Sequence, residues 1–203
     1  MLSSEIIQMS GKPQYNEAAV IDAALDAFWR HGYTATSINV LTEATGLSRS
    51  SLYQRFQDKD GLFQVVLATY TDRLMRRMHS AEGVTARATL NALLRELLPA
   101  SPPRPPGCLL SRSCAEFAEL PTASREAVLE GMSRQRDVLV NLLREAIAAG
   151  ELPANADVDA LAWHFLGVMQ AVVSLPPAGA SLDELERMIA VAMLVWPEVS
   201  AAT

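Results

Sequence analysis

Short hydrogen-bonding side chains crowd the start of one predicted helix in the first third of the sequence: Ser48, Arg49, Ser50, Ser51 and Gln54. Hydroxyl, guanidinium and amide groups of this kind bond to phosphates and base edges when the N-terminus of a helix enters the major groove of DNA. Helix N-termini also attract phosphate, here at Ser48 and at Lys59. The segment therefore predicts a small surface that reads double-stranded DNA.

A tight turn between two short predicted helices holds these side chains in place. Gly46 supplies the left-handed backbone conformation that such a turn needs. Thr36 or Ser37 caps the helix before the turn, and Ser48 caps the helix after it. Leu47 anchors the turn in a small predicted core, made of Leu25, Phe28, Ile38, Leu41, Leu52 and Phe56. The second short helix is thereby presented on the surface.

The charge balance restricts any contact with DNA to a local patch. The chain has a net charge of −6 and a sequence pI of about 5.1, which argues against binding nucleic acid over the whole surface. Residues 1–60 hold five basic and seven acidic side chains, whereas residues 47–59 hold three basic and one acidic. A locally positive helix beside an acidic first helix is typical of a specific binder with weak non-specific affinity.

Four short motifs follow one another through this region: Thr36-Ser37, Ala44-Thr45-Gly46-Leu47-Ser48, Leu52-Tyr53-Gln54-Arg55-Phe56 and Asp58-Lys59-Asp60-Gly61-Leu62. As a set, they resemble the DNA-binding region of the TetR/AcrR family of bacterial transcriptional regulators, over about 50 residues from Glu17 onward. Thr45 replaces the usual alanine, Ser50 stands where glycine or proline is common, and Arg55 replaces the common histidine. These departures alter the DNA-facing surface, so no operator sequence can be carried over.

The resemblance implies roles for the matching positions. Tyr53 and Lys59 would hold phosphates, and Arg49, Ser50 and Gln54 would face bases. Thr36 and Ser48 would cap helices and touch the DNA backbone, and Ser37 and Ser51 complete the expected DNA-binding set. The alternatives are a partly buried aromatic at Tyr53, a solvated charge at Lys59 and an ion pair between Arg49 and a nearby acid.

Apolar residues recur at helical spacing almost throughout the chain, and Gly and Pro fall where helices end. The predicted fold class is all-α, with about nine helices: 16–31, 36–45, 48–56, 59–80, 85–98, 109–119, 122–149, 157–174 and 181–196. Five prolines within residues 99–107 predict a stiff surface loop. We expect a helix-turn-helix DNA-binding domain at 1–60 and a helical effector-binding and dimerisation domain at 61–203.

The last two predicted helices are the expected interface of a homodimer. The eighth helix is apolar on most sides, so each of these sides must be buried against other apolar surface. The ninth carries an apolar stripe at Leu182, Leu185, Met188, Ile189, Ala192 and Trp196. Two copies would pack these helices as a four-helix bundle and set two reading helices about one DNA turn apart on a palindromic operator.

An unidentified small-molecule effector is the expected partner of the C-terminal domain. Gln135 and Arg136 interrupt the apolar stripe of the seventh helix, which is typical either of a ligand pocket or of a surface salt bridge. The candidate pocket residues are Phe117, Met132, Gln135, Arg136, Trp163, His164 and Met169. The aromatic and Met residues at helical spacing are also compatible with plain core, and His164 with a hydrogen-bonded core or interface histidine rather than a metal ligand.

Cys108 stands at the junction of the proline-rich loop and the sixth helix. A thiol near a helix N-terminus can have its thiolate stabilised by the helix dipole. The Gly-Cys-Leu junction also resembles that of family members that sense electrophiles or oxidants through a cysteine. Cys108 is therefore a candidate redox or electrophile sensor, as an alternative to a reversible ligand site; a small buried side chain is the other interpretation.

Several function classes find no support in the sequence. No Ser/His/Asp arrangement, HExxH motif, phosphate-binding glycine loop or carboxylate–histidine cluster is present, so neither an enzyme, a cofactor nor a metal site is expected. Two cysteines are too few for a disulfide scaffold or a Cys-based zinc site. No secretion signal or membrane span is visible, and we expect a cytoplasmic protein. A small all-helical enzyme and an interaction protein that has lost DNA binding are distant alternatives.

Overall fold

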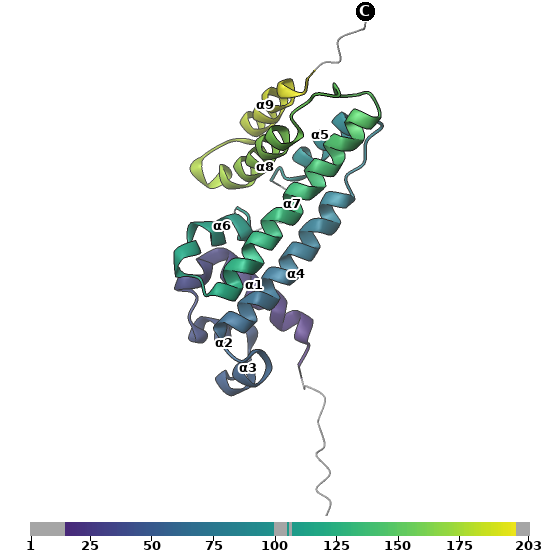
Figure 1. The fold of residues 1–203 in the computed structure, drawn as a ribbon. Coiled ribbons are helices and arrows are strands. Elements are labelled where there is room, and N and C mark those ends of the chain that lie inside the picture. The colour runs from purple at the N-terminus through teal and green to yellow at the C-terminus, as the bar shows by residue number, and fades with distance from the viewer. Residues whose placement is uncertain (1–14, 100–104, 106, 198–203) are drawn as a thin grey trace, which may run out of the picture.

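The computed structural model describes residues 15–99, 105 and 107–197, and the regular secondary structure of this part of the chain consists of helices alone (Figure 1). Its α-helices are α1 Glu17–Ala35, α2 Ile38–Thr45, α3 Arg49–Phe56, α4 Lys59–His79, α5 Ala86–Glu96, α6 Leu109–Ala115, α7 Thr122–Ala148, α8 Val158–Ser174 and α9 Leu182–Ala192. Short 3-10 helices follow α6, α8 and α9, at Phe117–Glu119, Pro176–Ala178 and Met193–Val195. The all-α prediction is confirmed. None of the described helices has the length and apolar character that a membrane crossing requires.

Side-chain caps start most of these helices where the sequence predicts them. Ser48 accepts from the backbone N–H of Ser51 at 3.1 Å, and the cap at Asp58 accepts from Gly61 at 2.8 Å. The predicted sixth and ninth helices are too long, because each ends in a 3-10 turn rather than in α-helix. The predicted loop at 99–107 lies largely outside the described residues.

The cap of α2 corrects one prediction. Ser37, not Thr36, is the N-cap, and its hydroxyl accepts from Val40 N–H at 3.3 Å. Thr36 is fully buried, and its hydroxyl donates to the carbonyl of Gly32 at 2.5 Å. Gly32 has φ of +81° and interrupts α1 one turn before its end. The hydrogen bond from Thr36 to Gly32 therefore stabilises the bend between α1 and α2.

The buried residues form two hydrophobic clusters, which we call the head core and the body core. The head core joins α1, α2 and α3 to the first half of α4 and to residues of α6 and α7. The body core joins the second half of α4 to α5, α7, α8 and α9. The long helices α4 and α7 run side by side through both (Figure 1). The predicted domain boundary at residue 60 falls at the start of α4, whose first turns, with Leu62, Phe63 and Val66, belong to the head core.

Most of the α9 stripe faces inward, although its first residue, Leu182, is 52% exposed. Leu185, Ile189, Ala192 and Trp196 are buried against the chain's own core, so they cannot supply a surface for a second copy. The exposed apolar residues of α8, α9 and the following turn are instead Trp163, Leu182, Val191, Leu194 and Val195. Periodicity had grouped the stripe correctly, but a helix with apolar residues on two sides does not reveal which side is covered internally.

Candidate functional site

The exposed face of α3 carries the side chains that the sequence predicts to read DNA. Leu52 and Phe56 turn into the head core, and this fixes the opposite face toward solvent. The Ser48 hydroxyl that caps α3 lies 2.9 Å from the hydroxyls of both Ser50 and Ser51. The exposed face thus presents Arg49, Ser50, Tyr53 (42% exposed) and Gln54, with the half-buried Ser51 beside them. The capping Ser37 of α2 is also exposed, whereas the buried Thr36 is not available to a partner.

Lys59 lies at the first position of α4 and is held by the end of α1. Its Nζ donates to the carbonyl oxygen of Tyr33 at 3.0 Å and lies 4.0 Å from the centre of the Tyr33 ring. Burial lowers the pKa of the Lys59 ammonium, and the Glu116 carboxylate opposes that shift. The amine is thus half-buried and oriented by neutral groups, and no carboxylate in the described part of the chain forms a direct ion pair with it.

Two acidic residues of α1 pair with arginines of other helices, and Asp26 pairs with Arg30 within α1. Glu17 binds Arg55 through two hydrogen bonds, of 2.5 and 3.1 Å, and this contact lowers the pKa of the Glu17 carboxyl. Asp22 likewise pairs with Arg73 of α4. The positive excess expected for residues 47–59 therefore overstates the local charge, because Arg55 is already neutralised. Sequence counting missed this pair, which joins residues 38 positions apart.

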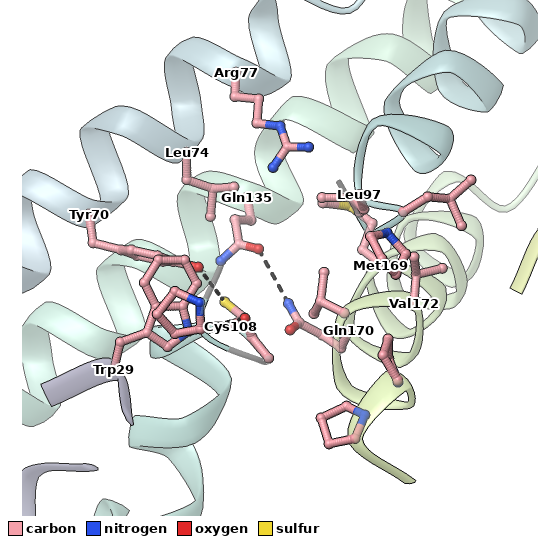
Figure 2. Close-up of a pocket in the computed structure, with 17 residues that line it drawn as sticks. Trp29, Tyr70, Leu74, Arg77, Leu97, Cys108, Gln135, Met169, Gln170 and Val172 are labelled. Carbon is pink, nitrogen blue, oxygen red and sulfur yellow. Dashed lines mark hydrogen bonds between the residues drawn. The ribbon is translucent and has the colours of Figure 1, made fainter. Parts of the chain in front are cut away.

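A cavity of about 270 Å³ lies between the two cores, walled by α1, α4, α6, α7 and α8 (Figure 2). Most of its lining is apolar: Trp29, Leu74, Leu97, Leu98, Pro99, Pro105, Gly107, Met169, Val172, Val173, Pro176 and Pro177. Its polar lining consists of Tyr70, Arg77, Cys108, Gln135 and Gln170. A mainly apolar cavity with a few convergent polar groups is the usual form of a small-molecule site.

The polar groups of the cavity are ordered by one another. The Tyr70 hydroxyl donates to the Cys108 sulfur at 3.3 Å (Figure 2), and burial is the main cause of the strongly raised pKa of Tyr70. The Gln170 amide donates to the side-chain oxygen of Gln135 at 3.3 Å, and Gln135 is itself buried. At the edge, the Arg77 guanidinium lies 3.8 Å from the Glu96 carboxylate.

Two of the seven predicted pocket residues, Gln135 and Met169, line this cavity. Met132 lies next to it, with its sulfur 3.8 Å from the Gln135 amide nitrogen. The other predicted residues lie elsewhere, namely Phe117, Arg136, Trp163 and His164. The lining residues that the prediction missed include Trp29 of α1 and Tyr70 of α4, because the sequence does not show how these two distant helices pack.

The physical reasons for these placements differ. Trp163 is 58% exposed on the outer side of α8, with the Arg136 guanidinium 5.4 Å from its ring centre. Arg136 also pairs with Asp159 at 2.6 Å, which is the surface salt bridge that the sequence left open. His164 packs edge-on against the next residue, Phe165, with 5.0 Å between ring centres. Phe117 lies beneath the guanidinium of Arg125, 6.0 Å away, in the turn after α6.

Helix α6 connects the cavity to the head. Cys108, its N-cap residue, is buried in the cavity wall, whereas Cys114 is exposed. Beside it, the carbonyl oxygen of Gly107 accepts a hydrogen bond of 3.2 Å from the indole of Trp29 in α1. At the other end of α6, the Glu116 carboxylate accepts from the backbone N–H of Thr34 at 2.9 Å. Both ends of this short segment therefore contact α1.

Comparison with known proteins gives matches along nearly the whole chain. The family described as "Bacterial regulatory proteins, tetR family" matches residues 20–66, and "Tetracyclin repressor-like, C-terminal domain" matches residues 86–191. The HTH-type transcriptional repressor ComR of Escherichia coli is 30% identical over 205 residues, covering 97% of each chain. The HTH-type transcriptional regulator TtgR of Pseudomonas putida is 25% identical over 186 residues, covering 87% of this chain and 89% of its own.

Among solved structures, a cysteine mutant of the TetR family transcriptional regulator CifR, complexed with 26-base-pair operator DNA, superimposes with a TM-score of 0.80. It is 26% identical in sequence, and the match covers 92% of this chain and all of that one. The arrangement of the head and body is thus shared with a protein that was solved on its operator.

The buried phenol of Tyr70 predicts a loss of stability in alkali. A tyrosine in the unfolded chain loses its proton at about pH 10, whereas the raised pKa keeps Tyr70 neutral in the folded protein. The folded state then binds more protons, so the free energy of unfolding falls as pH rises above that value. Urea denaturation from about pH 8 to about pH 11 should show a smaller decrease in the free energy of unfolding for Tyr70→Phe than for the unmodified chain.

A remaining pH dependence is expected from Tyr33, whose pKa is raised mainly by burial. Tyr53→Phe, at an exposed position, is the matched control; equal slopes for all three proteins would contradict the assignment.

Proposed function

Because the chain belongs to the TetR family of bacterial transcriptional regulators, we propose that it represses transcription by binding a palindromic operator as a homodimer. A small, largely apolar effector in the cavity between the head and body cores would release it from DNA. The observation that carries the proposal is the exposed face of α3, whose polar side chains are held by a helix packed into the head core. Such a role would place the protein in the cytoplasm, beside the chromosome.

The sign of regulation and the DNA partner are supported by relatives. ComR is named as a repressor, and CifR was solved with operator DNA. In this chain, Tyr53 and Lys59 are suited to phosphates, since the first is exposed and the second makes no direct carboxylate contact within residues 15–99 and 107–197. Arg49, Ser50 and Gln54 are suited to base edges in the major groove.

The proposed dimer interface is the outer face of α8 and α9 and includes Trp163 and Val191. Large apolar side chains exposed together are typical of protein–protein contacts. Both helices lie at the opposite end of the molecule from α3 (Figure 1). A two-fold axis there would join the bodies and leave the two reading helices free to enter successive major grooves.

Effector control is supported by the position of the cavity. Its walls include Tyr70 and Leu74 of α4, the helix whose first turns belong to the head core, and Cys108 at the start of α6. A ligand that fits only one arrangement of these helices would favour that arrangement by its difference in affinity. The lining favours a small apolar molecule with one or two polar groups that hydrogen-bond to Gln135, Gln170 or Tyr70.

A second candidate mode of control is covalent modification of Cys108. Its sulfur lines the cavity and accepts a hydrogen bond from Tyr70, so an electrophile that enters the cavity meets a positioned thiol. In conjugate addition to an unsaturated carbonyl compound, the sulfur bonds to the β-carbon and the thiol proton ends on the α-carbon. The adduct would fill the cavity as a reversible ligand does.

Selection of bound oligonucleotides by the purified protein tests the DNA-binding function, and substitutions then separate the roles of α3. Tyr53→Ala and Lys59→Ala should weaken binding to all sequences, because phosphates carry no sequence information. Gln54→Ala should relax the preference at one base pair, by about 1–3 kcal/mol. Fluorescence anisotropy against single-base-pair operator variants measures both. An equal loss on every sequence for Gln54→Ala would refute its base-reading role.

The dimer is tested by placing a charge on the proposed interface. Val191 is 65% exposed in one chain, so Val191→Glu should leave the fold intact while it buries an unpaired carboxylate between two copies. Sedimentation velocity should show twice the 22.0 kDa chain mass for the unmodified protein and a shift to monomer for the variant. Leu129→Glu, on the 56% exposed Leu129 of α7, should remain dimeric. A dimer that survives Val191→Glu would place the interface elsewhere.

Covalent control is tested with N-ethylmaleimide on the Cys114→Ser variant, in which Cys108 is the remaining cysteine. If the thiol is a sensor, alkylation of Cys108 at about neutral pH should release the operator, whereas Cys108→Ser should keep its DNA affinity under the same treatment. Mass spectrometry reports the extent of modification. Full alkylation without release, or no reaction below about pH 8, would end this candidate and leave the reversible ligand.

A further inference from the structure

We infer that Asn39 of α2 is a positioning residue that orients Arg49 for base reading and thereby sets part of the operator preference. This inference rests on the proposed DNA-binding function. The Arg49 Nη2 donates to the side-chain oxygen of Asn39 at 2.7 Å, across the turn between α2 and α3. Both residues are exposed. The bond lies beside the serine cluster at the N-terminus of α3, on the face that the proposed function directs to DNA.

The partner of Arg49 differs from the partners of three other arginines around the head. Arg30, Arg55 and Arg73 each pair with a carboxylate of α1. Arg49, in the described part of the chain, bonds instead to a neutral amide. An amide fixes the guanidinium without cancelling its charge, so the full attraction for the acceptor-rich edge of guanine or for phosphate remains.

The geometry leaves Arg49 able to make a second, specific contact. A guanidinium has five N–H donors in one plane, and the bond to Asn39 uses one nitrogen. A bidentate contact to a base needs that plane in a fixed orientation, and a long side chain otherwise loses rotamer freedom when it binds. Holding Arg49 in advance reduces that loss and limits which base edge it can reach.

Asn39 is itself fixed by its helix. It lies two residues after the Ser37 cap, and its backbone carbonyl accepts from the Thr42 hydroxyl at 2.8 Å. Leu41, in the same helix, is fully buried in the head core. The acceptor therefore sits on a rigid element, which is what the precise placement of a neighbouring side chain requires.

The test uses the full chain and the operator obtained by selection, with two substitutions that separate orientation from charge. Asn39→Ala removes the acceptor and should reduce discrimination at the base pair read by Arg49 by about five- to tenfold, with an unchanged salt slope. Asn39→Asp keeps an acceptor in place but neutralises Arg49. It should keep the base preference, weaken binding to all sequences and lower the salt slope by about one.

Arg49→Ala identifies the base pair, and the double variant Asn39→Ala/Arg49→Ala should discriminate no worse than Arg49→Ala alone, because both changes remove one interaction. The inference is overturned if the two single changes affect different base pairs, if their effects add, or if Asn39→Ala weakens all sequences equally, as a phosphate contact would. Failure of the unmodified protein to select any sequence would instead refute the proposed function. Circular dichroism and thermal unfolding confirm that each variant is folded.

Discussion

The packing of one helix into two cores is the constraint on which the rest of this structure depends. The first turns of α4 are buried with α1, α2 and α3, and its later turns, through Met75 and Met78, are buried with α5, α7 and α8. Neither core can shift relative to the other without a change in the direction or the packing of this helix. The cavity lies beside the transition between the cores, where Tyr70 and Leu74 face it. The shape of the cavity and the orientation of α3 are therefore two properties of the same packing.

The charged side chains around α1 are also arranged in a way that bears on contact with DNA. An acidic chain would be repelled by DNA over most of its surface. The acids of α1 are placed against Arg30, Arg55 and Arg73, while Arg49 and Lys59 are held by an amide and by a carbonyl oxygen. Exposed ion pairs add little to stability. Their effect here is to pair three arginines around α1 with carboxylates, whereas Arg49 and Lys59, at the start of α3 and α4, are held by neutral groups.

The head could be predicted from the sequence because its determinants are local. Caps at Ser48 and Asp58, the glycine of the turn and apolar spacing fix the helices within a few residues. What could not be predicted depends on contacts between distant segments. The pairing of Glu17 with Arg55, and the joining of Trp29, Tyr70 and Cys108 in one wall, follow from how α1, α4 and α6 pack. Periodicity also could not tell that Trp163 lies on the outer side of α8, because that helix is apolar on both sides.

The cavity wall shared by the head and the body has a consequence for how a protein of this kind acquires new DNA targets and new ligands. The side chains of Arg49, Ser50 and Gln54 are exposed and belong to neither core, so under the proposed function substitutions there would redirect the regulator to new promoters at little cost to folding. Trp29 and Tyr70 instead face the cavity and also pack edge-to-face, with 5.1 Å between ring centres and with Tyr70 in the head core. Under the proposed function, a mutation there that admits a new inducer also changes the packing of the head core. New target genes would then be accessible through single substitutions, whereas new chemical signals would require compensating changes in both halves of the molecule.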